Sequence, residues 1–207
     1  MKRILNIESW PRKDHFNFFK QFEEPFFGVC VPVNCSRAYA DAKETGNSFF
    51  LTYLHKSLVA ANRTEPFRYR IAGEQVIIYD TVDASATINR PDGTMGFSYM
   101  KYDEDFGTFK STALAETVRV RNSSGLVPAI SGENVIHFSS VPWINFTSLS
   151  HARSFSFNDS CPKISFGKMT DSAGEKTMPV SIHVHHALMD GFHVAQFIDE
   201  FQRLMNE

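Results

Sequence analysis

The sequence has few cysteines, little net charge and no long hydrophobic run. Three of its 207 residues are cysteines, Cys30, Cys35 and Cys161, an odd number at spacings that match no common zinc-binding motif. We therefore expect reduced thiols in a cytoplasmic protein, with buried structural roles more common for such thiols than catalysis. The formal net charge is −2 and no run of basic residues occurs, so the composition argues against nucleic-acid binding.

Membrane and targeting signals are also missing. No stretch is long and apolar enough to span a bilayer, and the first residues, MKRILNIESWPRKDHF, lack the apolar core of a secretory signal. No repeat, low-complexity segment or linker divides the chain, so we expect a single domain over residues 1–207 without a membrane partner. The sequence is rich in phenylalanine, with 20 copies, which is weak evidence for an aromatic or apolar ligand.

Helical and strand patterns alternate without a regular rhythm. Periodicity predicts helices over 36–46, 48–63, 106–120 and 192–205, with Ser36 as an N-cap and Gly46 as a stop. A hairpin is predicted over 67–80, and further strands over 95–102, 134–142, 163–169 and 177–186. This mixture favours an α/β two-layer sandwich, with a mixed, largely antiparallel sheet covered by helices.

The segment HVHHALMDGFH, residues 183–193, places four histidines within eleven residues. Strand alternation puts Val180, Ile182 and Val184 on one face together with His186, whereas His183 and His185 lie on the other face. His186 is therefore a polar ring that continues an apolar row at the end of a strand. Asp190 and Gly191 follow, directly before the predicted helix.

Three interpretations of this segment compete. In the first, His186 is a satisfied core histidine and Asp190 caps the helix. In the second, His183, His185 and Asp190 bind a metal, although no second cluster supplies the remaining ligands. In the third, His186 is a general base, because a junction of strand, loop and helix can display a catalytic group on a rigid frame.

Three sequence blocks point to the third interpretation. His185 to Gly191 match the HHxxxDG signature of the CoA-dependent acyltransferases. Together with an N-terminal block, SWPRKDHF (9–16), and a central block, SSVPWINF (139–146), this segment resembles the type A chloramphenicol acetyltransferase family. The blocks occur in the family's order and extend over nearly the whole chain.

The resemblance implies a role for each matched residue. His186 would be the base that takes a proton from a substrate hydroxyl, and Ser139 would donate a hydrogen bond to the oxyanion of the intermediate. Asp190 would pair with Arg12 and hold the histidine loop in place. Ser165 would hold a water molecule near the intermediate.

The resemblance also implies the binding partners. The co-substrate would be acetyl-CoA, with Lys168 near its entrance, and the acceptor would be chloramphenicol or a similar small-molecule hydroxyl compound. The aromatic residues Phe18, Phe19, Phe97 and Phe146 match the walls of the acceptor pocket. No metal is implied, and family members are homotrimers with active sites between subunits.

The chain departs from the family pattern around the acceptor. Residues 20–25, KQFEEP, and His151 stand where the antibiotic-binding enzymes carry smaller or aliphatic residues. These departures do not affect the residues that carry out the chemistry, but they leave the identity of the acceptor open. Two other functions stay open: an acyltransferase of the dihydrolipoamide type, which normally follows lipoyl and linker segments, and a non-catalytic binding protein of the same fold.

Overall fold

A computed structural model describes residues 1–126, 132–154 and 159–207. The described helices are α1 (Lys13–Phe19), α2 (Ser36–Glu44), α3 (Phe49–Arg63), α4 (Phe106–Arg121) and α5 (Gly191–Met205), with short 3₁₀ turns η1 (Ile7–Ser9) and η2 (Glu65–Arg68). The strands are β1 (Lys2–Ile4), β2 (Phe26–Asn34), β3 (Tyr69–Ala72), β4 (Gln75–Tyr79), β5 (Asp83–Asn89), β6 (Met95–Phe97), β7 (Val135–Ser140), β8 (Lys163–Phe166), β9 (Thr170–Ser172) and β10 (Glu175–His185).

The main sheet is mixed and mostly antiparallel, as the sequence predicts. Among the described residues it has seven strands in the order β2-β10-β8-β7-β5-β6, and β9 pairs with β10. The β5–β7 and β7–β8 pairs are parallel and the other pairs are antiparallel. A smaller sheet in the order β1-β4-β3 contains the predicted hairpin of residues 67–80, whose turn has Gly73 at φ +59°.

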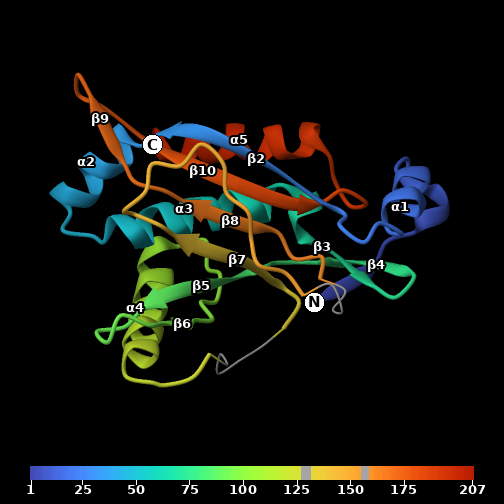
Figure 1. The fold of residues 1–207 in the computed structure, drawn as a ribbon, viewed down its shortest axis with the longest axis horizontal. Helices are drawn as coiled ribbons and strands as arrows, with labels where there is room; N and C mark the ends of the chain where they lie inside the picture. The colour runs from blue at the N-terminus through green and yellow to red at the C-terminus, as the bar shows by residue number, and fades with distance from the viewer. Residues whose placement is uncertain (127–131, 155–158) are drawn as a thin grey trace.

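Helices cover one face of the main sheet. Figure 1 shows α3 and α5 behind β8 and β10, while the segment between β7 and β8 passes in front of the sheet. Helical spacing predicts an apolar stripe on α5, of which Val194, Phe197, Phe201, Leu204 and Met205 are buried. Ile198, the sixth residue of the predicted stripe, is partly buried against the core. This burial fixes the helix that follows the histidine segment. Within the described residues, no helix is both long and apolar enough to cross a bilayer.

Several predicted element ends differ from those in the structure. Ser36 is not the N-cap of α2, because Cys35 holds that position and the Ser36 hydroxyl instead accepts a hydrogen bond of 2.8 Å from the Lys176 amide. The strand predicted over 95–102 is restricted to Met95–Phe97, and Met100 forms an isolated bridge with Ala84.

The face of the sheet opposite α3 and α5 is polar. In β8, Ile164 and Phe166 are fully buried, and Phe166 packs on Tyr53 of α3, so Lys163 and Ser165 point to the opposite face. The register continues this pattern across the sheet in two rows. One row is Ser85, His137, Lys163, His183 and Gly28, and the next is Ser139, Ser165, Ser181 and Cys30.

His185 offers a pH test of this polar face. Burial, and then the charges of Arg153 and Lys163, lower the pKa of His185 to about 4, against about 6.5 in an unfolded chain. Between these values the unfolded state binds more protons, so stability falls as the pH drops from about 6.5 towards 4. We expect the loss of unfolding free energy between pH 7 and pH 5, measured by urea titration, to be about 2 kcal/mol smaller in His185→Gln than in the wild type.

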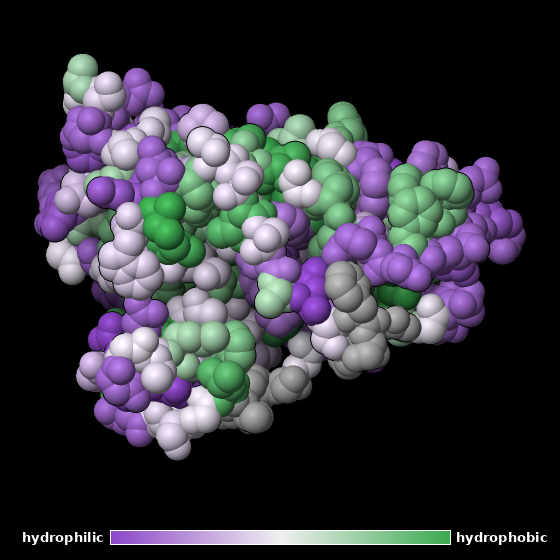
Figure 2. All heavy atoms as spheres, in the orientation of Figure 1, coloured by the Kyte–Doolittle hydropathy of each residue, from purple (hydrophilic) through white to green (hydrophobic). Residues whose placement is uncertain are grey.

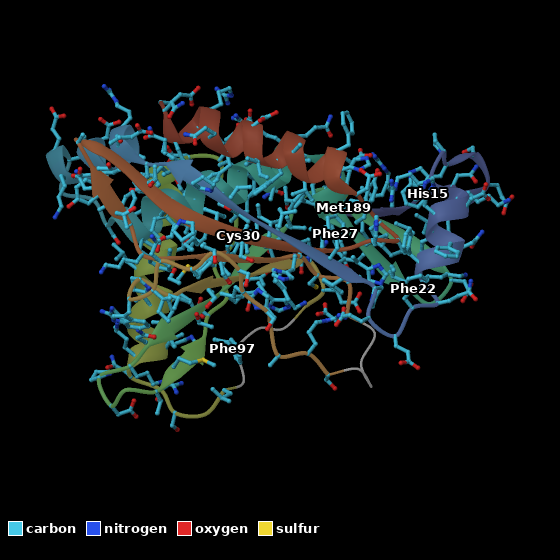
Figure 3. All side chains as sticks on the ribbon, turned by 45° about the horizontal axis from the view of Figure 1, so that its top comes forward. His15, Phe22, Phe27, Cys30, Phe97 and Met189 are labelled. Carbon is cyan, nitrogen blue, oxygen red and sulfur yellow. The ribbon has the colours of Figure 1, made fainter. Side chains whose placement is uncertain are left out.

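The matched control is His15→Gln, which changes an exposed histidine of α1 (Figure 3). This control should lose as much stability as the wild type over the same pH interval. An unchanged pH dependence in His185→Gln would show that this imidazole does not resist protonation in the folded state.

Candidate active site

His186 lies at the end of β10 and is held through both its backbone and its ring. Its amide donates a hydrogen bond of 2.8 Å to the Pro25 carbonyl, and Nδ1 lies 3.2 Å from the carbonyl oxygen of Met189. A carbonyl oxygen accepts and does not donate, so the neutral ring carries its proton on Nδ1. Nε2 then has an unprotonated lone pair, which is the form that a general base needs.

Aromatic side chains enclose the His186 ring. The ring of Phe19, on α1, stacks on the imidazole with centroids 3.9 Å apart and planes 18° apart. Phe27 of β2 lies on another side, with centroids 4.7 Å apart. Phe18 contacts Phe19 edge to face and is 59% exposed. Figure 3 labels Phe27, on β2, and Met189, in the loop after β10, which both contact His186.

Arg12 ties the histidine loop to the N-terminal segment. Its guanidinium forms an ion pair with Asp190 and donates a second hydrogen bond, of 3.1 Å, to the carbonyl of His186. The Asp190 carboxylate also caps α5 by accepting the Phe192 amide at 3.1 Å, and it lies 2.8 Å from Nδ1 of His193. Asp190 is thus both a helix cap and half of an ion pair.

The charge state of Asp190 follows from these partners. Partial burial raises the pKa of Asp190, but the positive charge of Arg12 and the contact with His193 outweigh burial and lower that pKa below its ordinary value. The carboxylate therefore stays ionised at neutral pH. It is suited to positioning the loop and is poorly suited to relaying protons.

Ser139 belongs to a second region, on the polar face of the sheet. It lines a cavity of about 690 Å³, and its hydroxyl lies 3.5 Å from that of Thr87. Phe97 lines the same cavity from β6. In Figure 2 the face that carries this cavity is hollowed between the lobe of β6 and α4 and the body of the sheet. The full lining is Ser85, Thr87, Met95, Phe97, Tyr99, Gly132, Glu133, Val135, His137, Phe138, Ser139, His151, Ala152, Arg153, Ser154, Asp159, Cys161 and Lys163.

One chain does not bring His186 and Ser139 together. Ser139 is level with Ser181, two strands away, through the register Ser139–Ser165–Ser181. His186 lies five residues beyond Ser181 along the chain. Two interstrand spacings and five residues of strand rise separate the Cα atoms of His186 and Ser139 by about 19 Å. Figure 3 likewise shows Phe97 well apart from Phe27 and Phe22. The two halves of the predicted site lie at different places on the molecule.

The remaining predicted residues neither contact the His186 ring nor line the cavity, although Ser165 is level with Ser139 on the neighbouring strand β8. Ser165 is fully buried, and among the described residues its hydroxyl has no hydrogen-bond partner. Phe146 is 9% exposed and packs over Gly167, where an added Cβ would lie 2.9 Å from its ring. The side chain of Lys168 is exposed, and its amide donates to the carbonyl of Ile144 at 2.8 Å.

Sequence reasoning missed the charged wall of the cavity. The wall includes His137, Arg153, Asp159 and Lys163, none of which stood out in a motif. Alternation along the predicted strands 134–142 and 163–169 was the available signal, since it places His137 on the same face as Ser139, and Lys163 on the same face as Ser165. The register that makes His137 and Lys163 neighbours is not a local feature.

One group of potential metal ligands occurs among the described residues. Ligand atoms of His137, Asp159 and Cys161 lie within 4.8 Å of one another. The Lys163 ammonium forms an ion pair with the Asp159 carboxylate, and it also donates to the Cys161 carbonyl at 3.2 Å. A cation would have to share the carboxylate with this ammonium, so the group is poorly suited to a metal.

Comparisons with known proteins agree on one family. The family model described as chloramphenicol acetyltransferase matches residues 2–202. A chloramphenicol acetyltransferase of Proteus mirabilis is 26% identical over 99% of this chain and 94% of its own length. A solved chloramphenicol acetyltransferase structure superimposes with a TM-score of 0.91, at 31% identity, over 99% of this chain and 100% of the other.

A second solved structure shares the fold at lower identity. It is a probable dihydrolipoamide acetyltransferase from Listeria monocytogenes, with a TM-score of 0.67 and 14% identity over 93% of this chain and 88% of the other. The resemblance predicted from the three sequence blocks is confirmed by the family match and by these structures. The chain belongs to the chloramphenicol acetyltransferase family, whose members are acyltransferases.

Proposed function

We propose that this protein is an O-acetyltransferase that moves the acetyl group of acetyl-CoA to a hydroxyl of chloramphenicol or a similar small-molecule acceptor. The observation that carries the proposal is the hydrogen bond between Nδ1 of His186 and the Met189 carbonyl, which leaves Nε2 as a proton acceptor. Family membership supplies the reaction class.

The reaction proceeds in a ternary complex without a covalent acyl-enzyme. Nε2 of His186 takes the proton of the acceptor hydroxyl while that oxygen attacks the thioester carbon of acetyl-CoA. The Ser139 hydroxyl donates a hydrogen bond to the oxyanion of the tetrahedral intermediate, a contribution commonly worth a few kcal/mol. When the C–S bond breaks, the departing thiolate takes the proton from Nε2, and the ester and free CoA leave.

This chemistry needs His186 of one subunit and Ser139 of another, because the two residues are about 19 Å apart within one chain. We propose a homotrimer with the reaction centre at each subunit interface. Exposed apolar side chains near both regions support self-association. Phe18 and Phe22 pack on Phe19 beside the histidine, Phe192 lies in the first turn of α5, and Trp143 and Ile144 follow Ser139.

The other predicted residues have assigned places in this scheme. Phe18 and Phe19 line the acceptor pocket on the histidine side, and Phe97 lines it on the serine side. Phe146 lies outside the cavity of a single chain, and its place in the pocket follows from the family resemblance alone. The buried, unpartnered hydroxyl of Ser165 supports a role in holding a water molecule. Lys168 is exposed, which suits contact with the charged part of CoA.

Replacing the base tests the mechanism directly. We expect His186→Ala to lower kcat by about 10³-fold in an assay of free thiol release from acetyl-CoA with chloramphenicol as acceptor, because general-base catalysis is lost. The dissociation constant for CoA, measured by calorimetry, should change little. His15→Ala serves as the control and should keep wild-type kcat.

Thiol release at the wild-type rate in His186→Ala would remove the assigned base. The same assay separates the rival functions. Activity with dihydrolipoamide and none with chloramphenicol would favour an acyltransferase of the dihydrolipoamide type. No thiol release with any acceptor would favour a non-catalytic binding protein.

The Arg12–Asp190 pair gives a separate prediction about stability. Removing the guanidinium takes the ion-pair partner from a partly exposed carboxylate, which keeps the Phe192 amide as a donor, and takes the side-chain donor from the His186 carbonyl. We expect Arg12→Ala to lower the free energy of unfolding by about 2 kcal/mol and to reduce kcat. Arg37→Ala, which breaks the exposed pair with Asp41, should cost no more than about 0.5 kcal/mol.

A double-mutant cycle with Asp190→Asn isolates the pair itself. The stability losses of Arg12→Ala and Asp190→Asn should be less than additive. Fully additive losses, or a melting curve of Arg12→Ala that matches the wild type, would contradict the proposed positioning role.

A further inference from the structure

Thr87 is the neighbour of Ser139 across two parallel strands of the main sheet. Ala86 of β5 is paired with Phe138 of β7, so the residues that follow them, Thr87 and Ser139, are level with each other. On the other side of Ser139 the register places Ser165 of β8. Ala86 and Phe138 are buried. Alternation therefore directs Thr87 and Ser139 to the polar face, where both line the cavity.

The backbone at Ser139 is held by contacts of the residues that follow it. The hydroxyl of Ser140 lies 3.0 Å from that of Tyr53, a buried residue of α3. The amide of Val141 donates a hydrogen bond of 2.8 Å to the carbonyl of Phe166. These contacts fix the end of β7, so rotation of the side chain and its hydroxyl is the freedom that remains at Ser139.

The Thr87 hydroxyl restricts this rotation. It donates to Oγ of Ser139 over 3.5 Å, and among the described residues no other side chain forms a hydrogen bond with that hydroxyl. Catalytic hydrogen bonds are often long in the absence of substrate and tighten when it binds. The branched side chain of Thr87 has a restricted χ1 angle, which holds the donor in place. Because Oγ of Ser139 accepts from Thr87, the hydrogen of Ser139 is left to point into the cavity.

We propose that Thr87 is a positioning residue that orients the Ser139 hydroxyl toward the oxyanion of the tetrahedral intermediate. The inference rests on the proposed acetyl transfer and adds the group that directs its oxyanion donor. When charge develops on the oxyanion, Ser139 donates to it while accepting from Thr87, and hydrogen bonds in such a chain strengthen one another. This gain arises in the transition state, so Thr87 should affect kcat and leave KM nearly unchanged.

A double-mutant cycle on kcat tests this role in the thiol-release assay, with the acceptor that the wild type acetylates fastest. Thr87→Val keeps the branched shape and removes the hydroxyl. We expect it to lower kcat about tenfold and to change KM for the acceptor and Kd for CoA by less than about twofold. In the Ser139→Ala background there is no hydroxyl to orient, so Thr87→Val should lower kcat by less than about twofold.

Further variants separate the hydroxyl from the shape of the side chain. Thr87→Ser keeps the donor and should retain kcat within about threefold of the wild type. Thr87→Ala removes the hydroxyl with a different change of shape, so it should lose kcat as Thr87→Val does and replaces that variant if valine prevents folding. The matched control is Thr112→Val, which removes an exposed hydroxyl of α4 and should keep wild-type kcat.

The outcomes separate this inference from the proposed function. Wild-type kcat in the variants without the hydroxyl, or an equal fold loss with and without Ser139, would overturn the inference and leave acetyl transfer standing. A Thr87→Ser variant no more active than Thr87→Val would also overturn the inference. No thiol release by the wild type with any acceptor would overturn the proposed function and the inference with it.

Discussion

The guanidinium of Arg12 joins two segments that are 178 residues apart in the sequence, and the arrangement of the histidine loop depends on it. It binds the carboxylate that caps α5 and the carbonyl of the catalytic candidate His186. α5 is fixed in turn by its buried apolar stripe, so the loop is held from both ends. A ring oriented in this way keeps Nδ1 on the Met189 carbonyl and Nε2 available. An ion pair beyond the end of β10 thus holds the loop in which Nδ1 of His186 contacts the Met189 carbonyl.

The second constraint is the alternation of the main sheet. The same strands that bury Ile164, Phe166, Ile182 and Val184 against the helices place hydroxyls, imidazoles and one ammonium on the opposite face. An apolar core and a polar cavity are therefore two sides of one sheet. The close packing of this polar face is visible at Gly28, where an added Cβ would lie 2.4 Å from the ring of His183. A side chain there would displace an imidazole.

Part of this arrangement can be read from the sequence. The alternation through residues 180–186 places His186 on the opposite strand face from His183 and His185, and the spacing of apolar residues predicts α5. Both patterns are local, so the sequence shows them. β2 gives no such pattern: Gly28 and Pro32 interrupt it, and Pro32 is tolerated because β2 is an edge strand of the main sheet. The short helix α1 and the strand β5 were likewise not anticipated from periodicity.

The composition of the cavity could not be predicted, because it depends on register between strands far apart in the sequence. His137 and Lys163 become neighbours through a parallel pairing that no local signal specifies. The separation of His186 from Ser139 is a similar long-range result. The motif resemblance correctly predicts the family, while a single chain places His186 and Ser139 in two regions that self-association would have to unite.

Subunit complementation tests the central claim, that His186 and Ser139 from different chains form one reaction centre. His186→Ala and Ser139→Ala would be purified separately, shown to be weakly active, and refolded together at equal amounts. In each mixed trimer one of the three interfaces combines an intact histidine with an intact serine. Random association at equal amounts makes about three quarters of the trimers mixed, so activity should recover to roughly a quarter of the wild type. If the mixture regains no activity although mass spectrometry shows mixed oligomers, the two residues do not act across a subunit interface and the account is wrong.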